Sequence, residues 1–600
     1  MVRLLLLGRY NFMLVLNYIH RLINYEEILM CKHFILITFV IFLASSHVNA
    51  KQQSQQIDNL LKSWQSKSKP GIAVAVNKNN KTVYENYFGV SNLENLTPIT
   101  SKTKFLIASV SKQFTAFAIS ILADEKKLSL QDDIRKYIPQ LPDYNHKITV
   151  MHLLNHTSGL RDSDDLNGLI GAGLSDYVSF NDAYNLIVQQ KKLNFIPGSK
   201  FDYSNSGYIL LAKIVENISD KSFREFMNAR VFKPLEMNDT LVFDNPFEII
   251  GGKAKAYFSS DGKNHSANNL FSAVYGSTGI YTTLSDLSKW AMNFNQPKIG
   301  NKEVFKLMKT QGILTDGSTT NYGLGQEMKV HQGHNAIFHG GGQGAYRAYL
   351  LRFPESNLSV SILSNTSYST SLIIDYAFKI ADMYLENTKE NKAYDQTVIK
   401  ASMKNHTDFE PVDVPEVILK KYLGIYQIQP GLMFTIEQVN NNLQLLITGN
   451  EKTISLKPKT AQEFFLMNNN NGYKIVFPES KSNLVNSFSY FQNDFEYIGE
   501  RVNLVEYDKK SINWKGLEGL YYSEELNTIY SIEYDGRELM AIHARNMPIK
   551  LTSHQPDTFN GSATYFQEIK FQRDGTENVT GMLVSGSRSK EINFVKLESL

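Results

Sequence analysis

The stretch Phe105-Leu106-Ile107-Ala108-Ser109-Val110-Ser111-Lys112 places a serine and a lysine three residues apart. Apolar residues recur at helical spacing after it, which predicts a helix over 109–126 that begins at Ser109. Residues i and i+3 share one face of a helix, so we expect the hydroxyl of Ser109 and the amine of Lys112 to lie together. Backbone N–H groups at a helix start also favour developing negative charge.

These two residue types together suit nucleophilic catalysis. A serine hydroxyl is a poor nucleophile until a base takes its proton, and a buried lysine with a lowered pKa can take it. Taken alone, the pattern is more often a serine helix cap beside a solvated lysine. A lysine also stands three residues after four other serines: Ser66, Ser101, Ser260 and Ser587. The pair therefore needs support from elsewhere in the chain.

Tyr203-Ser204-Asn205 is a second candidate, in a loop before the apolar run 208–214. A lysine nearby can lower the pKa of a tyrosine from ~10 far enough for it to act as a general base. Asn205 offers both a donor and an acceptor to a substrate amide. A packed tyrosine beside an Asx turn is the alternative interpretation, since Tyr84 and Asn86 have the same spacing.

His339-Gly340-Gly341-Gly342 is a third candidate, in a glycine-rich segment predicted to open a strand through Leu351. Glycines before a strand let a substrate backbone approach closely. A backbone N–H there can also serve as an oxyanion donor. The nearby His331 and His334 have no acidic partner at a familiar metal-site spacing. The sequence indicates neither a metal nor a cofactor.

Strands are predicted at both ends of the first 390 residues, with helices between them. The β-rich runs 71–76 and 82–87 predict a hairpin near the start. Residues 358–363 predict a returning strand after a turn, and 371–385 a closing helix. A sheet built from both ends of the segment, with a helical insertion, fits this order.

After the first 390 residues the chain becomes polar, which predicts a linker, and beyond the linker the pattern changes to short β-like runs. Two similar openings, 421–426 and 517–522, each precede short β-like runs with Gly or Asn turns. This spacing predicts a duplicated β-barrel or sandwich, with one merged β domain as the alternative. We therefore divide the chain into an N-terminal extension and signal peptide (1–50), a catalytic domain (51–390), a linker (391–415) and two β-barrel-like domains (416–510 and 511–600).

Composition excludes several classes of protein. The 600 residues carry 62 Lys plus Arg against 59 Asp plus Glu, a net charge of +3, which argues against a nucleic-acid binder. The single cysteine, Cys31, rules out disulfide scaffolds and cysteine-rich zinc modules. Residues 30–50 have a short basic region, an apolar run and the small-residue end Val48-Asn49-Ala50, which is typical of a secretory signal.

We therefore expect an exported protein, periplasmic or secreted, without a membrane span once the signal is removed. A membrane anchor is the alternative, and Met30 is a second possible start.

In this order, the three motifs resemble the serine β-lactamase and penicillin-binding superfamily, in its class C β-lactamase, D-aminopeptidase and esterase branch. The resemblance spans residues 55–388. Further stretches that match are Pro70-Gly71, Leu153-Leu154-Asn155-His156-Thr157-Ser158-Gly159-Leu160, Ser277-Thr278-Gly279, Asp286-Leu287, Arg352-Phe353-Pro354-Glu355 and Ser364-Asn365. The resemblance implies a β-lactamase-like α/β/α sandwich, an antiparallel sheet with a helical insertion, followed by two small antiparallel β-barrel-like domains. It also makes His156 and Ser158 part of a structural turn.

The resemblance implies a role for each candidate residue. Ser109 would attack a carbonyl and form an acyl-enzyme. Lys112 and Tyr203 would share the general base and acid work, and Asn205 would hold the substrate amide.

The glycine-rich strand would complete the site. The backbone N–H groups of Ser109 and Gly342 would form the oxyanion hole, while His339 and Gly341 would bind substrate. His339 stands where many relatives have lysine. A histidine, with a pKa of ~6.5, is largely neutral at pH 7, so carboxylate-bearing β-lactams are less expected as substrates than amino-terminal peptides or esters.

The resulting prediction is an exported serine hydrolase acting on small-molecule or peptide amides and esters, with D-amino-acid peptides first and short esters second. The alternatives are a D-Ala-D-Ala carboxypeptidase or β-lactamase, and a non-catalytic binding protein on the same fold. The complete Ser, Lys, Tyr, Asn and His set argues against the binding protein. In related D-aminopeptidases a barrel loop reaches the active site, so we expect 416–600 to restrict access. The sequence does not indicate an oligomeric state.

Overall fold

The computed structural model describes residues 51–173, 176–385, 409–448, 452–467, 473–480, 482–492, 495–503, 508 and 512–598. The predicted signal peptide, Cys31 and residues 391–408 of the predicted linker lie outside these ranges. The chain divides into a short unit ending at Gln65, helical over 51–60 and η1 (Lys62–Trp64), and a large unit from Ser66 onward. Among the helices so described, none is both long and apolar enough to cross a membrane.

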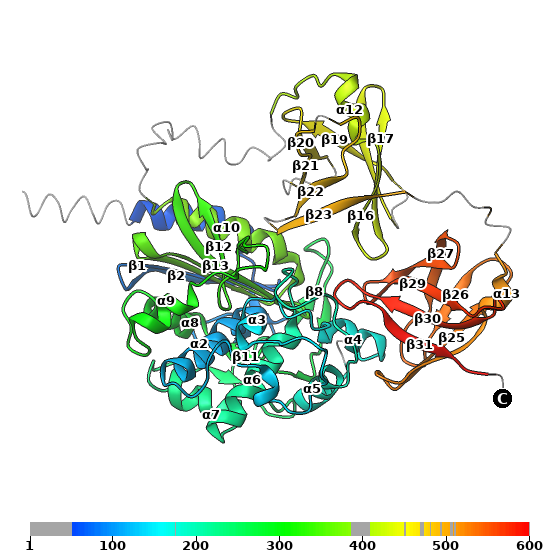
Figure 1. Ribbon diagram of the computed structural model, residues 1–600. Coiled ribbons are helices and arrows are strands. Elements are labelled where there is room, and N and C mark those ends of the chain that lie inside the picture. Colours follow the sequence, from blue (N-terminus) through cyan, green and yellow to red (C-terminus); the bar gives the residue numbers. More distant parts are fainter. Residues whose placement is uncertain are drawn as a thin grey trace, which may run out of the picture. The chain divides into compact units, whose positions relative to one another are not determined.

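A six-stranded antiparallel sheet is the centre of the first domain (Figure 1). Its strands in spatial order are β12 (Glu327–His331), β13 (His334–Gln343), β14 (Tyr346–Phe353), β15 (Leu358–Ser364), β1 (Ile72–Lys78) and β2 (Lys81–Phe88). β1 and β2 pair as the predicted hairpin, and β1 also pairs with β15 from the far end of the domain. The prediction of a sheet built from both ends is confirmed.

Helices cover both faces of this sheet. α10 (Thr370–Asp382) packs on β14 and β15, and the ring of its Phe378 meets those of Tyr349 in β14 and Phe338 in β13. α8 (Leu284–Asn293) packs against β1 and β15 on the opposite face (Figure 1). Two covered faces explain why β1 is a continuous apolar run rather than an alternating one.

The glycine-rich segment differs from its prediction. It does not open a strand through Leu351: Gly340, Gly341 and Gly342 are themselves in β13, and the chain then reverses into β14. The reversal occurs at Gly344, whose φ of 53° is a left-handed conformation that glycine adopts at little cost. A Cβ there would also lie 2.0 Å from Oδ1 of Asn268.

The helical insertion lies between β2 and β12. Its helices are η2 (Ala108–Val110), α2 (Ser111–Asp124), η3 (Ile134–Lys136), α3 (Val150–Leu154), α4 (Ser163–Leu169), α5 (Phe180–Val188), α6 (Asn205–Ser219), α7 (Phe223–Met227), η4 (Asn228–Phe232), α8 and α9 (Lys302–Met308). Short strands join them: β3 (Val90–Asn92), β4 (Thr97–Pro98), β5 (Phe105–Leu106), β6 (Val178–Ser179), β7 (Leu241–Val242), β8 (Ala256–Phe258), β9 (Ser266–Asn268), β10 (Ser272–Ala273) and β11 (Ile280–Thr282).

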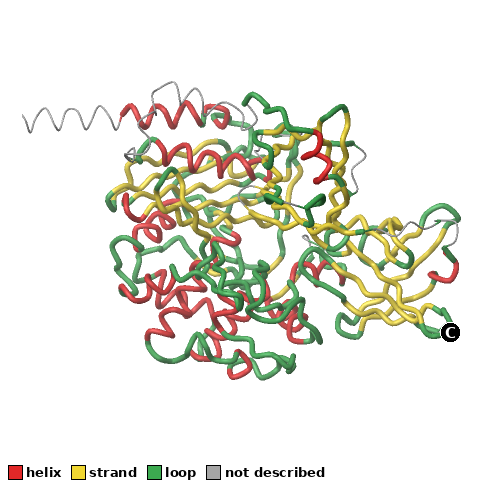
Figure 2. The backbone as a smooth tube through the Cα atoms, turned by 45° about the horizontal axis from the view of Figure 1, so that its top comes forward, coloured by secondary structure: helices red, strands yellow, loops and turns green. Residues whose placement is uncertain are grey.

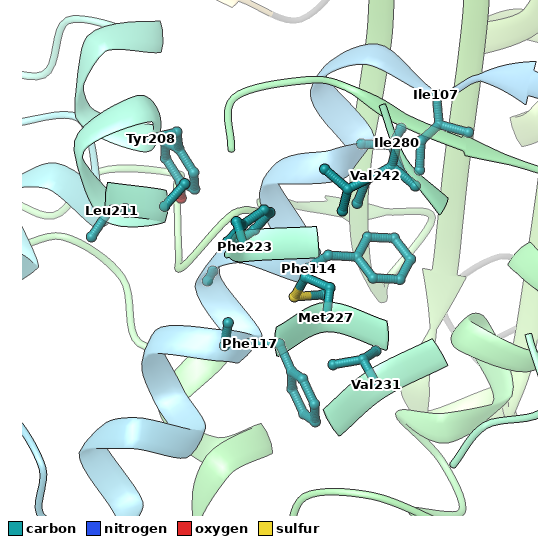
Figure 3. Packing of buried hydrophobic residues seen from close by; sticks show 14 of the residues in the cluster. Ile107, Phe114, Phe117, Tyr208, Leu211, Phe223, Met227, Val231, Val242 and Ile280 are labelled. Carbon is teal, nitrogen blue, oxygen red and sulfur yellow. The ribbon is translucent and has the colours of Figure 1, made fainter. Parts of the chain in front are cut away.

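α2 runs through the middle of this insertion and is buried from Ser111 to Leu122. Phe114 and Phe117 pack among Met227 and Val231 (Figure 3). Phe114 also stacks on Trp290, with ring centroids 4.1 Å apart. A helix buried all round is held rigidly, so the residues at its start are fixed in place.

The C-terminal half forms two closed eight-stranded antiparallel barrels, in which strands predominate (Figure 2). The first comprises β16 (Gly424–Gln429), β17 (Leu432–Val439), β18 (Asn442–Ile447), β19 (Ile454–Pro458), β20 (Glu463–Leu466), β21 (Lys474–Val476), β22 (Ser487–Gln492) and β23 (Phe495–Val502). The second comprises β24 (Gly519–Ser523), β25 (Thr528–Tyr534), β26 (Leu539–Ile542), β27 (Ile549–Gln555), β28 (Thr558–Ala563), β29 (Phe566–Arg573), β30 (Val579–Ser585) and β31 (Ile592–Lys596). The predicted fold class is confirmed, and the merged single β domain is wrong.

The two barrels open in the same way. A short helix, α12 (Glu416–Tyr422) or α13 (Trp514–Leu517), leads through a glycine with φ near 145° into the first strand. In that strand the hydroxyl of Tyr426 or Tyr521 donates to the carbonyl four residues earlier, at 2.9 and 2.6 Å. This shared arrangement of helix, glycine and tyrosine explains why residues 421–426 and 517–522 have similar sequences.

The second barrel is joined to the catalytic domain by a buried ion pair. Nη1 of Arg161 lies 2.7 Å from Oε2 of Glu525, and the two side chains are 0% and 6% exposed. Arg161 also donates to the carbonyls of Lys590 and Glu591. Removing one partner of a buried pair typically costs about 3–5 kcal/mol, because the remaining charge is then buried without compensation, so both residues are needed at this contact.

Candidate active site

The candidate nucleophile, Ser109, lies in the 3-10 turn η2 and not at the start of an α-helix as predicted. α2 begins two residues later, at Ser111. The preceding residue, Ala108, has a φ of 46°, a conformation that costs a non-glycine residue about 1–3 kcal/mol and is concentrated at functional sites. Ser109 is partly exposed while Lys112 is fully buried, so a substrate can reach the hydroxyl but not the amine.

Nζ of Lys112 lies at the centre of the site. It is 2.7 Å from Oδ1 of Asn205, 2.9 Å from the carbonyl of Ser277 and 3.3 Å from Oγ of Ser109. A neutral amine has two protons and one lone pair. With the protons on the two carbonyl oxygens, the lone pair faces the Ser109 hydroxyl, which is the arrangement a general base needs.

The surroundings favour this neutral form. Burial lowers the pKa of Lys112 from 10.5 to about 7, against the opposing effect of Asp164 and Asp162, while Arg588 lowers it further. At pH 7 a substantial fraction of this lysine is therefore ready to accept a proton.

We expect kcat/KM to depend on pH with an acid limb centred near pH 7. Below its pKa of about 7, Lys112 is protonated and cannot accept the serine proton, so activity falls by about tenfold per pH unit. A pH series from 5 to 9 with a chromogenic amide measures this limb. Burial also raises the pKa of Asp165 to about 7, so D165N is the control. A limb that disappears in D165N contradicts the assignment to Lys112.

Tyr203 lies against the same amine. Its ring centroid is 4.8 Å from Nζ of Lys112. We predicted that a nearby lysine would lower its pKa, but burial raises the pKa of Tyr203 well above 10, only partly offset by a hydrogen bond with Ser109. The phenol therefore stays protonated, which leaves Lys112 as the candidate general base.

Asn205 is the first residue of α6, and both ends of its amide are fixed. Oδ1 accepts from Lys112, and Nδ2 donates to Oδ2 of Asp164 at 2.8 Å. Its backbone N–H donates to Oδ2 of Asp162 at 2.6 Å. The predicted amide-binding residue is thus directly bonded to the predicted base.

The glycine strand passes beside the nucleophile. The pairing of β12 with β13 stops at Phe338, and the following residues of β13 face η2. A Cβ on Gly341 would lie 2.2 Å from the carbonyl of Ile107 and 3.2 Å from the backbone N of Ser109. Glycine is therefore required there, and it brings the strand that contains Gly342 against Ser109.

His339 is 2% exposed and packed into the site wall. Its Nδ1 is 2.6 Å from the carbonyl of Gly340, which can only accept, so Nε2 accepts from the hydroxyl of Tyr322 at 2.9 Å. Burial lowers the pKa of His339 to about 3. Both ring nitrogens already have protein partners, and the imidazole carries no charge at neutral pH.

Four neighbours of the site were not predicted. Tyr322 bonds His339, while Asp162 and Asp164 bond Asn205. Arg588 comes from the second barrel and lies 3.3 Å from Asp162. Asp162 and Asp164 come shortly after the stretch 156–160, which matched the family. Their position close to that stretch could have identified them as neighbours of the site. Neither Tyr322 nor Arg588 is marked by any sequence pattern.

His156 is a structural residue. Its Nδ1 accepts from the backbone N–H of Ser204 at 3.1 Å, and its ring packs 4.2 Å from that of Tyr203. His156 therefore fixes the loop that carries Tyr203.

Comparison with known proteins places these residues in context. The Beta-lactamase family model matches residues 55–381. Penicillin-binding protein 4* of Bacillus subtilis is 26% identical over 416 residues, 64% of this chain and 85% of that protein. A D-aminopeptidase of Gluconobacter oxydans is 26% identical over 297 residues, 49% of this chain and only 56% of that relative's length. The octameric penicillin-binding protein homologue from Pyrococcus abyssi has the same fold, with a TM-score of 0.52, 23% identity, and coverage of 75% of this chain and 99% of that one.

Proposed function

The chain belongs to the beta-lactamase family, and we propose that it is an exported serine hydrolase that cleaves small amides or esters of D-amino acids through an acyl-enzyme. D-amino-acid peptides are the first substrate class of this proposal and short esters the second. Its export rests on residues 30–50, which lie outside the described ranges.

The contact of Lys112 with both Ser109 and Asn205 carries the proposal. In the first step Oγ of Ser109 bonds to the substrate carbonyl carbon, its proton passes to Nζ of Lys112, and the carbonyl π pair moves onto oxygen. The backbone N–H groups of Ser109 and Gly342 stabilise that oxyanion.

The tetrahedral species then collapses. The bond to the leaving nitrogen breaks, and that nitrogen takes a proton from Tyr203, which Lys112 restores. Water then attacks the acyl-enzyme by the same route, releasing the acid and freeing Ser109.

The charges around the site support a D-amino-acid amide over a β-lactam. His339 is neutral and both its ring nitrogens are bonded, so it offers no fixed positive charge to a substrate carboxylate. Arg588 is charged, but it already faces Asp162 and Asp164. Since neither His339 nor Arg588 offers a free positive charge to a carboxylate, the site fits an amide or ester substrate better than a carboxylate-bearing β-lactam.

A substrate panel tests the proposal. We expect the mature protein to cleave a D-alanine p-nitroanilide at least about tenfold faster than its L-enantiomer or a chromogenic cephalosporin, in kcat/KM. Rapid cephalosporin turnover contradicts the proposal and supports a β-lactamase.

The second candidate is a penicillin-binding D-Ala-D-Ala carboxypeptidase, which the long match to penicillin-binding protein 4* favours. A penicillin adduct that is released slowly, together with cleavage of a peptide ending in D-Ala-D-Ala, would support it over the D-aminopeptidase.

A further inference from the structure

A loop of the second barrel, residues 586–591 between β30 and β31, reaches the hydrogen-bond network of the catalytic domain. Nη2 of Arg588 lies 3.3 Å from Oδ1 of Asp162 and 3.4 Å from Oδ2 of Asp164. The Asp162 side chain is fully buried, whereas that of Asp164 is 62% exposed. One guanidinium therefore faces two carboxylates that differ in their access to solvent.

Those two carboxylates fix Asn205. Asp162 accepts from its backbone N–H at 2.6 Å, and Asp164 accepts from its Nδ2 at 2.8 Å. Because a carboxylate can bond only the NH₂ end of an amide, Asp164 selects the flip state of Asn205. The other end, Oδ1, then faces Nζ of Lys112 at 2.7 Å.

The loop is attached to the domain without the guanidinium. The backbone N–H of Arg588 donates to Oδ2 of Asp165 at 2.6 Å. Its carbonyl accepts from Nδ2 of Asn194 at 2.8 Å and from the N–H of Asp162 at 3.1 Å. Changing the Arg588 side chain therefore leaves the main-chain bonds that dock the loop.

We infer that Arg588 is a positioning residue of the hydrolase: it holds Asp162 and Asp164 so that Asn205 presents its oxygen to Lys112. The inference rests on the proposed function for its kinetic consequences, and on geometry alone for the orientation of Asn205. It gives a loop of the second barrel a supporting role behind Asn205.

The charges around Lys112 predict in which direction the loss of Arg588 shifts the pKa of that lysine. The groups that face Lys112 from the elements around it are Asp162, Asp164, Arg588, His156, His339, Tyr203 and Tyr208. The two histidines are held neutral, because burial lowers the pKa of each. Without the guanidinium, the two carboxylates act on Lys112 uncompensated, and its pKa rises.

The test uses the full chain with three variants. R588M removes the charge and keeps most of the length, R588K restores a charge, and K590M removes a charge from the same loop outside the network. Rates with the D-alanine p-nitroanilide are measured from pH 5 to 9, beside the thermal midpoint.

We expect R588M to lower kcat by about 10²-fold, the scale of a misplacement of about 1 Å in a catalytic group. We expect its acid limb to move up by about one pH unit. R588K should restore most of the lost kcat and most of the original position of the acid limb. K590M should match the unaltered protein in both quantities. An R588M protein with unchanged kcat and limb overturns the inference. Equal losses in R588M and K590M with lowered thermal midpoints also overturn it, because the loop would then be merely structural.

A crystal structure of R588M supplies a readout that needs no substrate. We expect the contact between Oδ1 of Asn205 and Nζ of Lys112 to be lost, and an unchanged contact overturns the inference. If the unaltered protein cleaves none of the panel, the proposed function fails. The crystal structure still decides the role of Arg588.

Discussion

Replacing Ser109 by alanine is expected to abolish turnover, with a loss in kcat of about 10⁶-fold, the scale seen when a serine enzyme loses its nucleophile. Ser109 is partly exposed on a strained turn, and its Oγ is 3.3 Å from the amine of a fully buried lysine. The measurement is the intact mass of the protein with and without a fluorophosphonate probe. We expect one adduct on the unaltered chain and none on S109A.

Ser111 offers a matched control. It lies two residues further on, is fully buried, and its Oγ accepts from the backbone N–H of Ile280 at 3.3 Å. S111A should therefore still be labelled. An adduct that persists on S109A would place the nucleophile elsewhere. A folded chain that takes no adduct at all would bring the non-catalytic binding protein forward.

The parts of the fold that sequence could predict depend on local patterns. The hairpin of β1 and β2 and the returning strand β15 were predicted because each is a short apolar run with turn residues beside it. The pair Ser109 and Lys112 was predicted because three residues along a helical turn bring side chains together. The duplication of the barrels was predicted from openings of similar sequence.

The parts that could not be predicted depend on contacts between distant segments. Arg588 and Asp162 are more than 400 residues apart, and only the docking of the second barrel brings them together. The raised pKa of Tyr203 comes from burial, which no spacing of motifs reveals. The left-handed turn at Ala108, which places Ser109 in a 3-10 turn, occurs at a residue type that rarely adopts it.

Replacing Lys112 by methionine is the second large effect we expect. A general base typically contributes about 10²–10⁴-fold to the rate, so we expect K112M to lose activity by that factor and to lose the acid limb near pH 7. Its stability should change little, because the lost hydrogen bonds to Asn205 and Ser277 are offset by the removal of a buried amine. Lys112 is 0% exposed, and a buried amine without a carboxylate in contact is costly to desolvate, whereas methionine is not. Activity against pH and the thermal midpoint measure the two effects separately.

K112R distinguishes a base from a fixed cation. Arginine keeps the donors that bond Asn205 and Ser277, but its pKa above 12 prevents it from accepting the proton of Ser109. K112R should therefore be as inactive as K112M. If K112R instead keeps activity within about tenfold, the site needs a positive charge rather than a base, and proton transfer must be reassigned to Tyr203. Inactivity of both variants in folded protein leaves Lys112 as the residue that activates the serine.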